Sequence, residues 1–159
     1  MSIQKKVKPV NVLGYKDLKL SSPVFEQNGF IPKQYTCHGL NVSPPIDIDS
    51  IPLPAKSLAI IVDDPDAPKG TFCHWVIWNL PISHHLRMGA NHGMQGMNDF
   101  GRHQYDGPCP PSGVHRYNFK VYALDCILYI PVSSNKENLE KAIARNIVGF
   151  GILTGKYGQ

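Results

Sequence analysis

The 159-residue sequence lacks the long apolar runs of membrane and exported proteins. No stretch approaches the roughly 18 uninterrupted apolar residues of a membrane-spanning helix. The opening residues, MSIQKKVKPV, contain no apolar segment like that of a secretory signal. The net charge is only +4, and no basic stripe with interleaved aromatic residues indicates a nucleic-acid binder. We therefore expect a cytoplasmic protein that neither spans a membrane nor binds nucleic acid.

Metal and nucleophile motifs are scarce as well. The four cysteines, Cys37, Cys73, Cys109 and Cys126, show no CxxC spacing. We therefore expect free thiols in a reducing compartment and no structural zinc site. The G-x-S-x-G elbow of many hydrolases is also absent. We expect no catalysis, no metal and no cofactor.

Glycine and proline, in contrast, are abundant, with 14 of each. Both residues favour turns over long helices, so the composition predicts a mainly β fold. The chain length suits one domain. Apolar and β-branched runs predict strands over 17–25, 56–64, 71–80 and 114–124.

One helix is predicted, near residues 135–148, where apolar residues recur at helical spacing. Ser134 and Glu137 have the spacing of a capping box at its start. The chain then ends in a glycine-rich tail, GFGILTGKYGQ. Residues 81–113 show no periodicity but carry several Met and aromatic residues, so we expect an ordered, packed loop.

Strand alternation assigns faces to the side chains of two predicted strands. In 114–124, the residues His115, Tyr117, Phe119, Val121 and Ala123 share one face. Arg116, Asn118, Lys120 and Tyr122 share the other, which predicts a half-buried antiparallel strand. In 71–80, the same rule places His74 with Val76 and Trp78.

Two proline-stiffened turns adjoin strands that carry a histidine. Asp64 and Asp66 lie in the first turn, and GPCPPSG at 107–113 precedes His115. We infer that both turns meet at one rim, where Asp64, His74, His115 and Tyr117 line a small polar pocket.

Imidazolium and phenol donors suit a phosphate-like anion. Asp64 would repel that anion, so we expect it to orient a histidine and to raise the histidine pKa. Three alternatives remain at this point: core histidines without a ligand, a metal site of two histidines and one carboxylate, and a hydrolase using Ser112 with His115.

Several motifs together resemble those of the phosphatidylethanolamine-binding protein family, also called Raf-kinase-inhibitor-like. The signatures are DPDAP at 64–68 and GVHRY at 113–117, with HWVIWNLP and NDFGRHQYDGPCPP between them. LSSPVFEQNGFIPKQYTCHGLNVSPP and the ending TGKYGQ are similar to the bacterial branch. The resemblance covers a single domain at 18–159, after an N-terminal extension at 1–17.

This resemblance implies a sandwich of two antiparallel β-sheets with a few peripheral helices, and a small pocket for anions. The ligand-binding residues that it implies are Asp64, Asp66, His74, Pro110, Pro111, His115 and Tyr117. It also implies a cis peptide at Ala67–Pro68. His38 stands where bacterial members carry aspartate, which makes it a further candidate donor.

The function that we expect is therefore a non-catalytic binding protein for a phosphate-bearing small molecule or phospholipid head group. Lipid is the less favoured ligand, because the chain lacks the C-terminal helix that shapes the pocket mouth in animal members. The alternative is a regulator of a kinase or protease that recognises a phosphorylated or acidic peptide. A phosphoester or lipid hydrolase is less favoured, and a homodimer is compatible with the resemblance.

Overall fold

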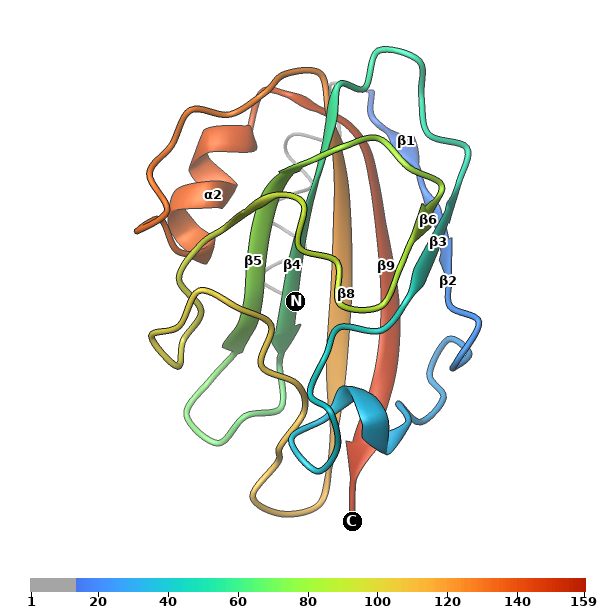
Figure 1. Cartoon of the computed structure of the whole chain (residues 1–159), viewed down its shortest axis with the longest axis vertical. Coiled ribbons are helices and arrows are strands. Elements are labelled where there is room, and N and C mark those ends of the chain that lie inside the picture. The colour runs from blue at the N-terminus through green and yellow to red at the C-terminus, as the bar shows by residue number, and fades with distance from the viewer. Residues whose placement is uncertain (1–13) are drawn as a thin grey trace.

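The computed structural model describes residues 14–159 and shows a mainly β architecture (Figure 1). The strands are β1 (Lys16–Asp17), β2 (Lys19–Ser21), β3 (Ile46–Asp49), β4 (Ser57–Asp64), β5 (Phe72–Leu80), β6 (His85–Leu86), β7 (Met94–Gln95), β8 (Val114–Leu124) and β9 (Ile147–Gly158). The helices are the 3-10 helix η1 (Lys33–Tyr35) and the α-helix α2 (Lys136–Ile143). The basic run at Lys5–Lys8 lies outside the described residues.

The strands form two sheets, as predicted. The large sheet has the order β1-β9-β8-β4-β5-β7, and the small sheet has the order β2-β3-β6. All pairings are antiparallel except that of β1 with β9, which is parallel. The small sheet covers one face of the large sheet, and α2 lies on the other face (Figure 1).

Two apolar cores follow from this layering. The core between the sheets contains Ile48 of β3, Leu86 of β6 and alternate residues of the central strands. The core under α2 contains Leu139 and Ile143 of the helix with the remaining residues of those strands. Since both faces of the large sheet are covered, the central strand β4 is buried throughout, which explains its nearly continuous apolar sequence.

Consecutive aspartates at the end of β4 point to opposite faces. Asp63 faces α2, where its carboxylate accepts hydrogen bonds from Lys120 at 3.0 Å and Lys136 at 2.9 Å. Asp64 faces His115 on the side of the small sheet. Asp63 and Lys120 are almost completely buried, and burial lowers the pKa of Lys120 against the opposing effect of Asp63.

The strands over 56–64, 71–80 and 114–124 are confirmed to within a residue. The β8 face that carries Lys120 and Tyr122 was predicted to be open to solvent. This prediction is wrong for these two residues, which α2 covers. The glycine-rich tail, in which the sequence predicted no strand, forms β9. This strand pairs with β8 along its whole length.

The helix predicted near 135–148 is present but shorter, because it ends at Ile143 and Ile147 begins β9, and its predicted cap is wrong. It begins at Lys136, and its capping box consists of Asn135 and Asn138 rather than Ser134 and Glu137. The Asn135 side chain accepts from the Asn138 backbone N–H, and the Asn138 side chain accepts from the Asn135 N–H.

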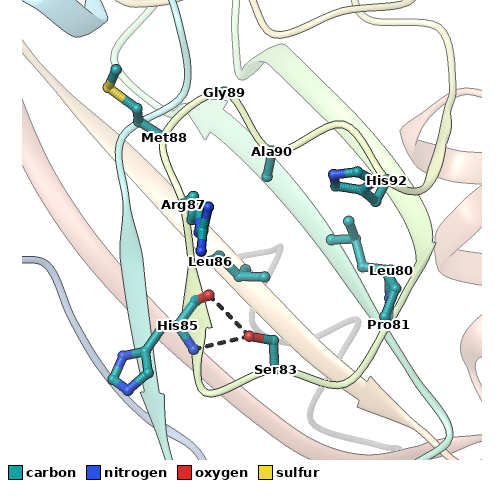
Figure 2. Close-up of a pocket in the computed structure, with 10 residues that line it drawn as sticks. All are labelled: Leu80, Pro81, Ser83, His85, Leu86, Arg87, Met88, Gly89, Ala90 and His92. Carbon is teal, nitrogen blue, oxygen red and sulfur yellow. Dashed lines mark hydrogen bonds between the residues drawn. The ribbon is translucent and has the colours of Figure 1, made fainter.

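The long connection at 81–113 is packed only in part, because Tyr105 is buried whereas Met88, Met94 and Phe100 are exposed. Its first part lines an open cavity of about 370 Å³ (Figure 2). Leu80, Leu86 and Ala90 supply apolar lining. The side chains of His85 and Met88 point away from the hollow (Figure 2). The other polar residues of its lining are Ser83, Arg87 and His92. Within residues 14–159, no helix is long and apolar enough to cross a bilayer.

The Asp63 network generates a stability prediction. Asp63→Asn keeps the shape of the side chain but leaves the buried Lys120 ammonium without its counter-charge. We expect the free energy of unfolding at pH 7 to fall by about 3–5 kcal/mol. Urea denaturation measures it, with the exposed Asp49→Asn as the matched control. A loss below about 1 kcal/mol would show that the ion network is not required.

Candidate functional site

Three loops meet at one end of the large sheet and form a small pocket. They are the β4–β5 turn, the segment around Phe100 and the turn before β8, and the two turns lie at the lower end of the molecule in Figure 1. The pocket has a volume of about 160 Å³. Its lining residues are Asp64, Ala67, Pro68, Phe72, His74, Phe100, Cys109, Pro110, Pro111, His115 and Tyr117. The structure thus brings together the four polar residues that the sequence placed in one pocket.

Asp64 holds the ring of His115. One carboxylate oxygen lies 2.7 Å from His115 Nδ1, and the other accepts the backbone N–H of Asp66 at 2.7 Å. A carboxylate is acceptor-only when ionised, so His115 Nδ1 carries the proton. Both side chains are buried, at 5% exposure for Asp64 and 11% for His115. The expected orienting role of Asp64 thus agrees with the geometry, and Nε2 of His115 is the ring nitrogen left for a ligand.

His74 is held in the same way by a backbone carbonyl. Its Nδ1 donates to the Asp106 carbonyl oxygen at 2.6 Å. Burial lowers the pKa of His74, and this effect exceeds the opposing effects of the Asp106 carbonyl and the Asp64 charge. Since the ring is neutral at pH 7, its Nε2 is a hydrogen-bond acceptor. The Asp64 charge does raise the pKa of His74, as expected of a carboxylate, but burial has the larger effect.

A network behind His74 fixes the Asp106 segment. The Asp106 carboxylate accepts hydrogen bonds from Arg102, Asn98 and Gln104. Burial raises the pKa of Asp106, but these hydrogen bonds outweigh it and hold the pKa below its usual range. The carbonyl that orients His74 therefore belongs to a residue whose own carboxylate is fixed by three neighbouring side chains.

A β-bulge places His74 in the pocket. Val62 pairs with Trp75, but the next residue, Asp63, pairs with Cys73, so that His74 is the extra residue. Trp75 faces the core between the sheets, and the His74 ring packs edge-on against Tyr117 at a centroid distance of 5.4 Å. The predicted shared face of His74, Val76 and Trp78 is therefore wrong, because Val76 and Trp78 lie in the core under α2.

Tyr117 forms the floor between the two histidines. Its ring stacks on His115 at a centroid distance of 6.4 Å, and its hydroxyl is buried near the Cys109 backbone. Burial above all, and then the charge of Asp64, raise its pKa against the opposing effect of the Cys109 backbone, which lowers it. The hydroxyl consequently stays protonated and can serve as a donor.

Comparison with known proteins shows a family relationship. The family model described as phosphatidylethanolamine-binding protein matches residues 21–158. The chain belongs to the phosphatidylethanolamine-binding protein family. A UPF0098 protein of Pyrococcus abyssi is 49% identical over 155 residues, covering 91% of this chain and 86% of that one. A UPF0098 protein of Chlamydia muridarum is 42% identical, covering 89% and 99%. Archaeal and bacterial proteins are thus both similar to it.

Solved structures are similar over the whole domain. A phosphatidylethanolamine-binding protein homolog of Chlamydia trachomatis superposes with a TM-score of 0.86 at 38% identity, covering 91% of this chain and 99% of that one. Escherichia coli YbcL, described as a new member of the mammalian family, gives 0.82 at 27% identity, covering 89% and 98%. The fold expected from the resemblance is confirmed.

Within this family member, Asp66 lies beside the pocket rather than in its lining. Its carboxylate accepts hydrogen bonds from the backbone and guanidinium of Arg116, which hold the pKa of Asp66 at about 2. Asp66 therefore ties the β4–β5 turn to β8. A ligand-binding role for Asp66 stays a prediction.

His38 also lies outside the lining, next to an unexpected disulfide. Its Nδ1 is 2.7 Å from the Tyr157 hydroxyl. Cys37 and Cys109 form a disulfide across 72 residues of sequence, which overturns the expectation of free thiols for these two, whereas Cys73 and Cys126 are free. No spacing rule identifies this pair. No peptide bond among residues 14–159 is cis, so the expected cis Ala67–Pro68 bond is wrong.

The aromatic walls of the pocket escaped the sequence interpretation. Phe72 and Phe100 pack edge-on at 4.7 Å, and each packs against His74. Their only sequence signal is Phe100 inside the motif NDFGRHQYDGPCPP. Phe100 is 42% exposed, so one ring separates His74 from solvent.

This packing generates a prediction for the titration of His74. In nuclear magnetic resonance, the ring protons of His74 should titrate below the ordinary pKa of 6.5. Phe100→Ala should move the pKa toward 6.5, because water reaches the ring. Phe30→Ala, a more exposed phenylalanine at 59%, is the control. Since the folded-state pKa is the lower one, His74 stabilises the fold above pH 6.5, and this contribution is lost as the pH falls through the folded pKa. A wild-type pKa at or above 6.5 would contradict the burial argument.

Proposed function

We propose that this protein binds a phosphate-bearing small molecule or head group, without catalysis, in the pocket of Asp64, His74, His115 and Tyr117. The observation that supports this most is that both histidine Nδ1 atoms already have hydrogen-bond partners. His115 Nδ1 is bonded to Asp64, and His74 Nδ1 is bonded to the Asp106 carbonyl. This leaves two Nε2 atoms and the Tyr117 hydroxyl for one ligand. Once protonated, these nitrogens become donors, and such donors, held by a rigid frame, suit an oxyanion.

Proton uptake is part of the proposal. A neutral Nε2 accepts hydrogen bonds, and so do the oxygens of a phosphate dianion. The two can pair only if a proton sits on a histidine or on the phosphate. A protonated histidine also attracts the anion against the repulsion of Asp64. Binding should therefore strengthen as the pH falls.

The pocket walls indicate what the anion is attached to. Pro110, Pro111, Phe72 and Phe100 surround the polar floor with apolar surface. A short carbon segment next to the phosphate could pack on these walls, as an ethanolamine or a glycerol phosphate would. The small volume favours such a ligand over a whole lipid, and Phe100, at 42% exposure, leaves a path for a larger attached group.

The regulator function remains the alternative within this proposal. A phosphorylated peptide would bring the same anion to the same floor and would extend over the exposed Phe100. The hydrolase is less favoured because Tyr117, the hydroxyl on the pocket floor, has a raised pKa and is therefore not an activated nucleophile. The cytoplasmic location and a homodimer also remain proposals. A disulfide is typical of exported proteins and also of intracellular proteins of hyperthermophiles.

Calorimetric titration with O-phosphorylethanolamine tests the proposal. We expect affinity about tenfold higher at pH 5.5 than at pH 7.5, since uptake of one proton is worth about 1.4 kcal/mol per unit of pKa difference. His115→Ala should weaken binding at least tenfold at pH 5.5. The control is His92→Ala, because His92 lines the larger cavity of Figure 2.

The possible outcomes separate the alternatives. Equal affinity at both pH values would exclude the proton-coupled mechanism. A loss with His92→Ala but not with His115→Ala would move the ligand to the other cavity. A phosphoserine peptide that binds at least tenfold more tightly than O-phosphorylethanolamine would favour the regulator, and turnover of the phosphoester would favour the hydrolase.

A further inference from the structure

We propose that reduction of the Cys37–Cys109 disulfide creates a zinc site whose third ligand is His38. One ligand atom from each of these residues lies within 4.8 Å of the other two. Among residues 14–159, no other three His, Cys, Asp or Glu residues gather in this way. Two thiolates and one imidazole form a ligand set that Zn²⁺ prefers, with a fourth position open to water or another ligand.

The structure keeps these ligands together without the disulfide. The Cys37 backbone N–H donates to the Pro108 carbonyl at 3.2 Å, and the Gly107 N–H donates to the Asn41 side chain at 2.7 Å. The Tyr105 hydroxyl donates to the Tyr35 carbonyl at 2.8 Å. Cleavage of the sulfur–sulfur bond therefore leaves both loops joined by other bonds, and the two thiols remain neighbours.

The move from disulfide to metal site is small. Two zinc–sulfur bonds of about 2.3 Å at a tetrahedral angle place the sulfurs roughly 3.8 Å apart. The Cα atoms are already 5.5 Å apart, so the sulfurs need to separate by less than about 2 Å, which χ1 rotation can supply. His38 is held beside them by its bond to Tyr157. Both His38 and Cys109 are exposed, so a reductant and a metal ion can reach them.

The chemistry balances with a dithiol reductant of the thioredoxin class. The reductant gives two electrons and two protons to the Cys37–Cys109 bond and is itself oxidised to a disulfide. The resulting two thiols each lose one proton when Zn²⁺ binds. The site can therefore hold either the Cys37–Cys109 disulfide or a Zn²⁺ ion, but not both.

Anaerobic titration of the reduced full-length protein with Co²⁺ and then Zn²⁺ tests the proposal. We expect one Co²⁺ per chain with thiolate charge-transfer bands and tetrahedral d–d bands, displaced by Zn²⁺. The oxidised protein should bind neither ion. His38→Ala should weaken Zn²⁺ binding at least tenfold and alter the d–d bands. His103→Ala, another exposed histidine, and Cys126→Ser should leave binding unchanged.

A second measurement needs no variant. Zn²⁺ should protect Cys37 and Cys109 of the reduced wild-type protein from alkylation, as mass spectrometry of their peptides would show, and should leave Cys126 unprotected. Equal alkylation with and without Zn²⁺ would overturn the site. Unchanged affinity in His38→Ala, or stoichiometric binding by the oxidised protein, would overturn it too.

Discussion

The antiparallel pairing of β4 with β8 at the centre of the large sheet is the constraint on which both polar sites depend. It places Asp63 opposite Asn118 and so brings Asp64 level with the start of β8. Because side chains alternate along a strand, neighbouring aspartates serve opposite faces. Asp63 joins the lysines under α2, and Asp64 holds His115. The run of acids after an apolar strand therefore has two separate tasks, one for stability and one for the pocket.

The hydrogen bonds around the pocket fix the orientation of its histidine rings more than they add charge to it. One carboxylate oxygen of Asp64 accepts a hydrogen bond from the His115 ring, and the other accepts one from the backbone of its own turn. His74 receives its orientation from a neutral carbonyl, whose residue is anchored by a charged network on the far side. The two histidines therefore differ. The Nδ1 of His115 is bound to a carboxylate and that of His74 to a carbonyl, and burial lowers the pKa of His74.

The sequence predicted those parts of the structure that follow from local alternation. The β8 face with His115 and Tyr117 needed only the period of two. His74 escaped the same rule, because the bulge that turns it depends on how β5 fits against β4, which no local pattern encodes. The disulfide escaped for a similar reason, since two cysteines 72 residues apart become neighbours only after folding. The sequence did not predict the strand β9, because glycine is uncommon in strands. A Cβ on Gly155 would lie 2.5 Å from Ile31, so close packing between segments, rather than a loop, explains that glycine.

The frame around the pocket is held by several independent bonds, and this redundancy separates the roles of its parts. The disulfide joins the turn before β8 to the η1 segment, but so do the Cys37–Pro108 backbone bond and the Asn41 bond to Gly107. Asp66 and Arg116 fix the other turn from the outside. Cys109 lines the pocket, and Pro110 and Pro111 stiffen the chain after it. The position of this wall thus depends on the bonds of the whole turn and not on the disulfide alone.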